Sequence, residues 1–180
     1  MTTTQEQTHP MRVGDRTHRI IGALLRVQLS NERALRTVEI TRTASQVFSD
    51  YPITHRTREA YFDAVTAAGV YLNRFAPQYP WTLEAIEMAV GDSRLDIVHQ
   101  LEGNYLIDEV KLGVTRTGEQ SVQQQIARYL ALGNDLWRSS FLGVRLCALH
   151  EPFQTRLYLP DGHSSVPFVE SALHESLALR

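Results

Sequence analysis

The chain has 180 residues, a mass of 20.5 kDa and a net charge of −2, and a chain of this length can bury a core without disulfides or structural metal. This charge argues against a sequence-independent nucleic-acid coat protein, although a local group of arginines can still contact phosphates. The chain has a single cysteine, which excludes a disulfide framework, an iron–sulfur cluster and a thiolate zinc site. This residue, Cys147, lies in an apolar run and is expected in the core.

No run of eighteen apolar residues occurs, and residues 1–10 lack the apolar stretch of a signal peptide. We therefore expect a cytoplasmic protein without a membrane segment. Residues 1–16 show no periodicity and are expected to form a flexible lead-in to a single domain over residues 17–180.

The first half of the chain contains one clear helix and one ambiguous stretch. Residues 19–29 and 35–43 are apolar-rich runs that fit a β-hairpin, but the apolar positions of the first run also fit helical spacing. Residues 56–75 carry apolar side chains at three- and four-residue spacing, which predicts an amphipathic helix that ends before two prolines.

The second half alternates strands and helices. Residues 82–90, 94–101 and 105–112 are predicted to form a three-stranded meander, because turn signals separate three apolar runs. The later expected elements are a helix over 119–137, strands over 141–149 and 154–159, and a short helix over 168–179. This order predicts an α/β fold with a mixed β-sheet of about five strands flanked by helices on both faces.

Lys111 is the only lysine beside seventeen arginines, and it follows two candidate acids. If Glu102-Gly103 is the hairpin loop, Asp96 lies opposite Glu109; if the loop is one residue later, Asp96 lies opposite Lys111. Both registers place these three residues on one face, because side chains alternate along a strand. Asp108 alternates to the other face and is not expected in the site.

Two carboxylates about 5 Å apart on neighbouring strands can share a hard divalent cation, with Mg²⁺ or Mn²⁺ as the expected cofactor. The alternative is a solvated sheet face with a cross-strand ion pair. Apolar neighbours on both strands indicate that the strands are central, where unpaired carboxylates are costly. The pattern therefore favours a metal site that acts on phosphate.

These residues resemble the PD-(D/E)XK nuclease superfamily, with Asp96 as the first motif acid and Glu109-Val110-Lys111 as the second motif. Gln125 and Tyr129, four residues apart on one helix face, are similar to the glutamine and tyrosine of its RecB-like branch. The resemblance covers about residues 55–160 and implies a restriction-endonuclease-like core. It also implies that Gln125 and Tyr129 shape the site and contact the strand.

In this superfamily an earlier helix supplies a further acid, or in RecB-like members a histidine. Glu59 matches the acid as a metal ligand, and His55 is the weaker match to the histidine. The chain departs from the pattern at Leu95, where proline is usual, and at Leu112, where a hydroxylated residue is frequent. Three arginines flank the predicted site and are expected to contact phosphates: Arg94, Arg116 and Arg128.

The function expected from the sequence is a metal-dependent deoxyribonuclease in DNA repair, recombination or defence. Alternatives are a DNA-binding or assembly module that has the nuclease fold without turnover, and a nuclease for RNA or branched DNA. The expected partners are DNA and either a second copy of the chain or a larger nuclease–helicase complex. Endonuclease and exonuclease action both remain open.

Overall fold

The computed structural model describes residues 9–31, 33, 35–51, 56–76, 81–112, 116–149 and 155–167. The side chains of residues 9–15, 116–119 and 167 are outside that description. The chain divides into two compact units, residues 1–76 and 77–180, whereas the sequence favoured one domain from residue 17 onward. Within the described ranges, no helix combines the length and apolar character needed to cross a membrane.

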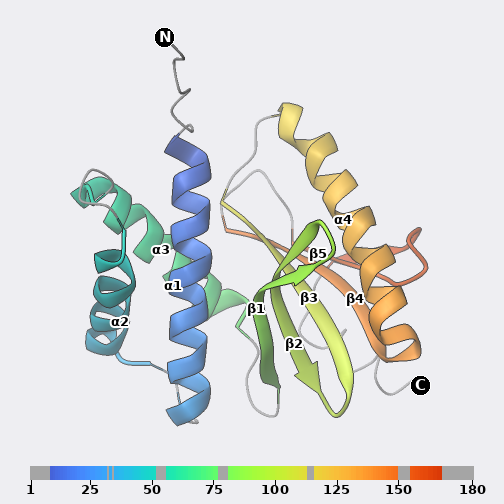
Figure 1. Cartoon of the computed structure of the whole chain (residues 1–180), viewed down its shortest axis with the longest axis horizontal. Helices are drawn as coiled ribbons and strands as arrows, with labels where there is room; N and C mark the ends of the chain where they lie inside the picture. Colours follow the sequence, from blue (N-terminus) through green and yellow to red (C-terminus); the bar gives the residue numbers. More distant parts are fainter. Residues whose placement is uncertain are drawn as a thin grey trace. The chain divides into compact units, whose positions relative to one another are not determined.

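The first unit is helical and contains α1 (His9–Asn31), α2 (Thr37–Ser49) and α3 (Arg58–Arg74) (Figure 1). The hairpin considered for residues 19–43 is wrong, because both runs form helices. Residues 19–29 belong to α1, and residues 37–43 belong to α2. The stretch expected to be a flexible lead-in is helical from His9. Helix α3 lies within the predicted range of residues 56–75 and begins two residues later than its start, and the side chain of its N-cap, Thr57, accepts a 3.2 Å hydrogen bond from the backbone N–H of Ala60.

The second unit is built on a six-stranded mixed sheet in the order β1-β2-β3-β4-β5-β6. The β3 and β4 strands are parallel, and the other neighbours are antiparallel. The predicted α/β class is confirmed, but the sheet has one strand more than expected. The strands are β1 (Thr82–Val90), β2 (Ser93–Leu101), β3 (Asn104–Lys111), β4 (Phe141–Ala148), β5 (Arg156–Tyr158) and the unforeseen β6 (Ser165–Pro167).

Helix α4 (Arg116–Trp137) connects the parallel strands β3 and β4 and runs along one face of the sheet (Figure 1). The helix expected over residues 56–75 is α3, which belongs to the helical unit. The closing helix expected over residues 168–179 lies outside the described residues.

The turn between β2 and β3 decides between the two predicted registers. Glu102 and Gly103 both have positive φ, 49° and 82°, which is the backbone of a two-residue type I′ turn. Leu101 therefore pairs with Asn104, and Ile97 pairs with Asp108. The same register continued by one residue places Asp96 opposite Glu109, as in the first of the two alternatives.

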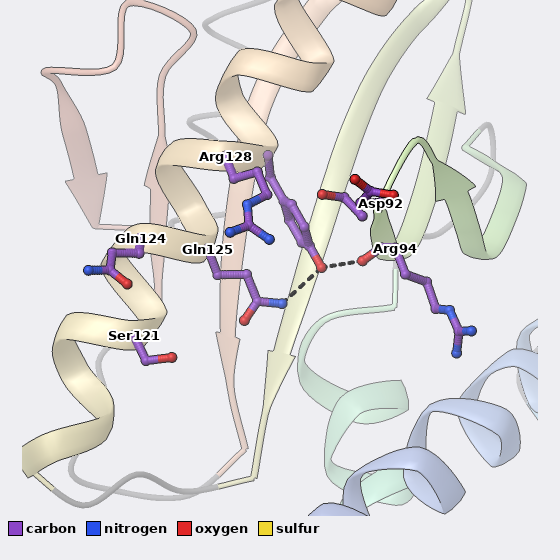
Figure 2. A pocket seen from close by; sticks show the side chains of 8 residues that line it. Asp92, Arg94, Ser121, Gln124, Gln125 and Arg128 are labelled. Atoms are coloured by element: carbon purple, nitrogen blue, oxygen red, sulfur yellow. Dashed lines mark hydrogen bonds between the residues drawn. The ribbon is translucent and has the colours of Figure 1, made fainter.

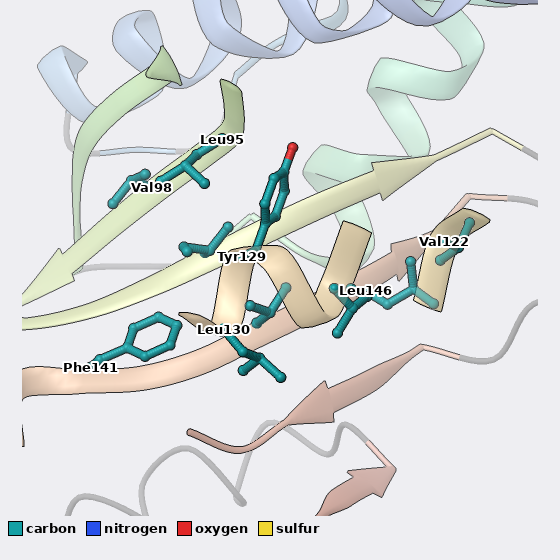
Figure 3. Packing of buried hydrophobic residues seen from close by; sticks show 10 residues of the cluster. Leu95, Val98, Val122, Tyr129, Leu130, Phe141 and Leu146 are labelled. Atoms are coloured by element: carbon teal, nitrogen blue, oxygen red, sulfur yellow. The ribbon is translucent and has the colours of Figure 1, made fainter. Parts of the chain in front are cut away.

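A single apolar cluster holds α4 against the sheet (Figure 3). Gly133 allows this close approach, because a Cβ at that position would overlap the ring of Phe141 at the start of β4. Burial of these side chains is the main stabilising contribution to this layer. The cluster contains Leu95, Val98, Ile107, Val122, Ile126, Tyr129, Leu130, Phe141, Val144 and Leu146.

Candidate active site

Two carboxylates from neighbouring strands lie beneath helix α4. Asp96 is in β2 and Glu109 is in β3, and both side chains are buried. Oδ2 of Asp96 accepts a 2.9 Å hydrogen bond from the backbone N–H of Val110, which fixes this carboxylate against the neighbouring strand. Central strands supply a rigid frame for such a pair.

Lys111 and Gln125 complete a polar group around Glu109. The ammonium of Lys111 forms an ion pair with Oε1 of Glu109. The Gln125 amide lies between the two, because its Nε2 donates to Oε2 of Glu109 at 3.1 Å and its Oε1 accepts from Nζ of Lys111 at 3.1 Å. One side chain from α4 thus orients both the acid and the ammonium.

Tyr129 links this group to the start of β2. Its hydroxyl accepts a 2.9 Å hydrogen bond from Nε2 of Gln125 and donates to the backbone carbonyl of Arg94. Burial raises the pKa of Tyr129, and the charges of Asp96 and Glu109 raise it further, so the hydroxyl keeps its proton and remains a donor. The tyrosine therefore fixes α4 at the end of the sheet that carries the acids.

The electrostatics of Glu109 show that negative charge is in excess here. Burial raises the pKa of Glu109 to about 8, with a further contribution from the negative charge of Asp96, although Lys111 acts in the opposite direction. Oε1 of Glu109 has no hydrogen bond of normal geometry among the described residues. A hard divalent cation would compensate both carboxylates, so the donor set fits Mg²⁺ or Mn²⁺.

A third carboxylate, which the sequence did not lead us to expect, reaches the same region from β1. The pairs Ile86↔Ile97 and Met88↔Leu95 place Glu87 opposite Asp96, and a carboxylate oxygen of Glu87 lies within 4.8 Å of one from Asp96. The backbone of Glu87 has a φ of 52°, which is rare for a residue with a side chain. Its Oε2 also pairs with Nη1 of Arg94 at 3.1 Å.

A sequence signal for Glu87 did exist. The turn at Gly91-Asp92 pairs Val90 with Ser93, and counting back along both strands pairs Glu87 with Asp96. In both hairpins the position of a two-residue turn therefore fixes which residues lie opposite each other, as it did for Asp96 and Glu109.

Asp108, which was expected on the other face, has different partners from Glu109. Its carboxylate accepts a 2.7 Å hydrogen bond from Nε of Arg145 and lies 3.2 Å from Nε2 of His99. All three side chains are buried. Asp108 is therefore part of a separate buried ion-pair network.

The remaining predicted residues divide between the two units. Glu59 is exposed in the first turn of α3, in the helical unit, and His55 is outside the described residues. The side chain of Arg116 is also outside that description. Arg94 and Arg128 lie beside the site, where they line a pocket together with Gln125 and Tyr129 (Figure 2).

No known protein family, curated protein sequence or solved structure matches this chain. The chemistry of the site is therefore argued from its own geometry. That geometry combines two buried carboxylates, a third nearby, and an ammonium and an amide that converge on one of them.

Proposed function

We propose that this protein is a metal-dependent nuclease that hydrolyses phosphodiester bonds of DNA. The observation that carries the proposal is the contact group around Glu109, in which Asp96 approaches from the next strand and Lys111 forms an ion pair. Two acids and a lysine on one sheet face are also the residues through which the sequence resembles PD-(D/E)XK nucleases. The mixed sheet supports a restriction-endonuclease-like core as part of this proposal.

Asp96 and Glu109 would hold Mg²⁺ or Mn²⁺. When bound, the cation would polarise the phosphodiester and favour the hydroxide form of an attacking water. Glu87 is the third ligand that the structure favours, because its carboxylate approaches Asp96. Glu59, the acid expected from the sequence, is the competing candidate.

Lys111 would orient the attacking water and neutralise the charge that develops on the phosphate. Gln125 positions the ammonium by accepting its hydrogen bond, and the same amide donates to Glu109. Tyr129 would have a positioning role. It accepts a hydrogen bond from Gln125 and donates one to the backbone carbonyl of Arg94 at the start of β2. These contacts hold the reacting groups before substrate binds, which is a requirement for efficient catalysis.

The partners that we propose are DNA and further protein chains. Cleavage of both strands of a duplex by a protein with one site calls for a second copy of the chain or a larger complex. An assembly module that binds DNA without cutting it, and a nuclease for RNA or branched DNA, are the other outcomes that an assay must distinguish.

The test incubates the purified chain with linear, circular and single-stranded DNA, and with RNA of the same sequence, in Mg²⁺, Mn²⁺ or EDTA. We expect metal-dependent cleavage that Lys111→Ala abolishes. Arg138→Ala removes a positive charge from an exposed position of the same unit and should leave cleavage unchanged. Cleavage that persists in Lys111→Ala or in EDTA would refute the assignment, and cleavage of RNA alone would correct the substrate.

A further inference from the structure

The pocket beside the proposed catalytic group lies between the β1–β2 turn and α4 (Figure 2). Its volume is about 230 Å³, below the range of about 300–1,000 Å³ that is usual for small-molecule sites. It therefore has the size for a small polar group. Its lining residues are Asp92, Ser93, Arg94, Ser121, Gln124, Gln125, Arg128 and Tyr129.

The chemistry of this lining favours an anion. Arg128 supplies a positive charge from α4 and Asp92 supplies one negative charge, whereas the side chain of Arg94 extends away from α4 (Figure 2). Arg128 is exposed and forms no ion pair or hydrogen bond with the part of the chain that the structure describes. Hydroxyl and amide groups of Ser121 and Gln124 are available as further donors.

The pocket offers little to a nucleobase. Its aromatic residue, Tyr129, is buried and uses its hydroxyl to bond Gln125 and the backbone of Arg94. Stacking of a base needs an accessible aromatic face, and the described lining does not provide one. A phosphate, with its several acceptor oxygens, matches the guanidinium of Arg128 and the hydroxyl and amide donors of the lining better.

Gln125 joins the pocket to the proposed catalytic group. The residue lines the pocket, and its amide also contacts Glu109 and Lys111. A phosphate in the pocket would therefore lie one side chain away from the residues that act on the scissile phosphate. We therefore expect the pocket and the proposed catalytic group to hold two phosphates of the same strand.

We propose that this pocket binds a phosphate of the DNA strand that flanks the scissile phosphate, with Arg128 as its cationic ligand. The inference rests on the proposed nuclease function and adds to it a fixed path for the strand. The guanidinium of Arg94 is instead engaged by Glu87. Arg128 is consequently the sharper residue to test.

The test measures binding of a fluorescein-labelled single-stranded DNA oligonucleotide to the full chain in EDTA, where no metal-dependent cleavage occurs. Arg128→Gln should weaken binding about tenfold and lower the slope of log affinity against log salt by about one. Arg138→Gln, a matched loss of charge outside the pocket, should change affinity much less. Asp92→Asn should tighten binding about threefold, because it removes a negative charge from the pocket.

A second series locates the phosphate. Oligonucleotides that carry one neutral methylphosphonate at successive positions are compared with wild-type protein and Arg128→Gln. At one methylphosphonate position the two proteins should bind with equal affinity, because the neutral linkage has already removed the contact between Arg128 and that phosphate. Equal effects of Arg128→Gln and Arg138→Gln, weaker binding by Asp92→Asn, or no DNA binding by the wild type would each overturn the proposal. Binding through Arg128 without cleavage in Mg²⁺ would support the pocket and refute the nuclease.

Discussion

Adjacent residues of β3 place two buried carboxylates in opposite electrostatic environments. Asp108 and Glu109 both have an exposed fraction of 0% and point to opposite faces of the sheet. Burial alone would raise the pKa of Asp108, but the charge of Arg145 and hydrogen bonds from His99 and Arg145 hold it well below its usual range. Asp108 is therefore an ionised and fully compensated acid.

Glu109 has the same burial without that compensation. Its pKa is raised to about 8 by burial and by Asp96, and Lys111 offsets only part of this effect. A buried group that the fold leaves in an unfavourable state is a candidate for function, whereas a compensated one serves the fold. The comparison thus separates a structural carboxylate from the one that we propose as catalytic, within two consecutive residues.

Replacing Glu109 gives the largest expected effect on activity. Glu109→Gln keeps the shape and the burial of the side chain but removes the negative charge that we propose binds the metal. We expect DNA cleavage to fall at least about 10³-fold, which corresponds to an increase of roughly 4 kcal/mol in the barrier. Thermal stability at neutral pH should stay equal or rise, because the folded chain no longer keeps a proton on Glu109 that the unfolded chain releases.

Initial cleavage rates and melting temperatures of the same preparations would check both parts. Glu84→Gln, an exposed acid on β1, is the matched control and should change neither quantity. Loss of cleavage that is accompanied by unfolding would assign Glu109 to the fold and would remove its contrast with Asp108.

Replacing Asp108 should have the reverse pattern. Asp108→Asn leaves the buried guanidinium of Arg145 without a counter-charge, and breaking such a pair costs about 3–5 kcal/mol of unfolding free energy. Urea unfolding would measure the loss, with Asp135→Asn on the exposed side of α4 as the control. A decrease in unfolding free energy below about 1 kcal/mol for Asp108→Asn would show that Asp108 does not serve mainly to stabilise the fold.

The sequence was sufficient for the part of the site that depends on local rules. Alternation along strands places Asp96 and Glu109 on one face in either of the two registers that the sequence left open, and helical spacing places Gln125 and Tyr129 on one face. These relations involve short sequence separations. They are consequently readable from residue patterns.

The parts that the sequence did not predict depend on longer-range packing or on backbone distortion. Arg145 is paired with Asp108 through the parallel β3–β4 ladder, and no local pattern assigns a partner 37 residues away. The positive φ of Glu87 interrupts a strand that was expected to be regular. In residues 19–43, helical and strand spacing competed, and the helical packing of the first unit decided between them.

The two acids should also give stability opposite pH dependences. Burial raises the pKa of Glu109 from 4.5, its value in an unfolded chain, to about 8 in the folded protein. The folded state therefore binds more protons between these values, and its stability should fall as pH rises, by up to about 1.4 kcal/mol per pH unit. Asp108 gives the opposite pH dependence, because its pKa is lowered in the folded protein. Its contribution to stability is present at pH values above the usual pKa of an aspartate and is lost on acidification.

Unfolding free energies measured in EDTA from pH 5 to pH 8 would test this difference. Glu109→Gln should remove the decline of stability across that interval, and Mg²⁺ should reduce the decline in the wild type by compensating the carboxylates. A decline that is the same in wild type and Glu109→Gln would show that another group titrates.

The smallest expected effect concerns which acid joins Asp96 and Glu109. Glu87→Gln should weaken Mn²⁺ binding about tenfold, a loss of one carboxylate ligand, because an oxygen of Glu87 lies within 4.8 Å of one of Asp96. The loss of its exposed ion pair with Arg94 should cost little stability. Titration calorimetry on Glu87→Gln and Glu59→Gln compares the two candidates directly. A larger loss in Glu59→Gln would show that the helical unit completes the metal site, and Glu87 would then serve mainly to hold Arg94.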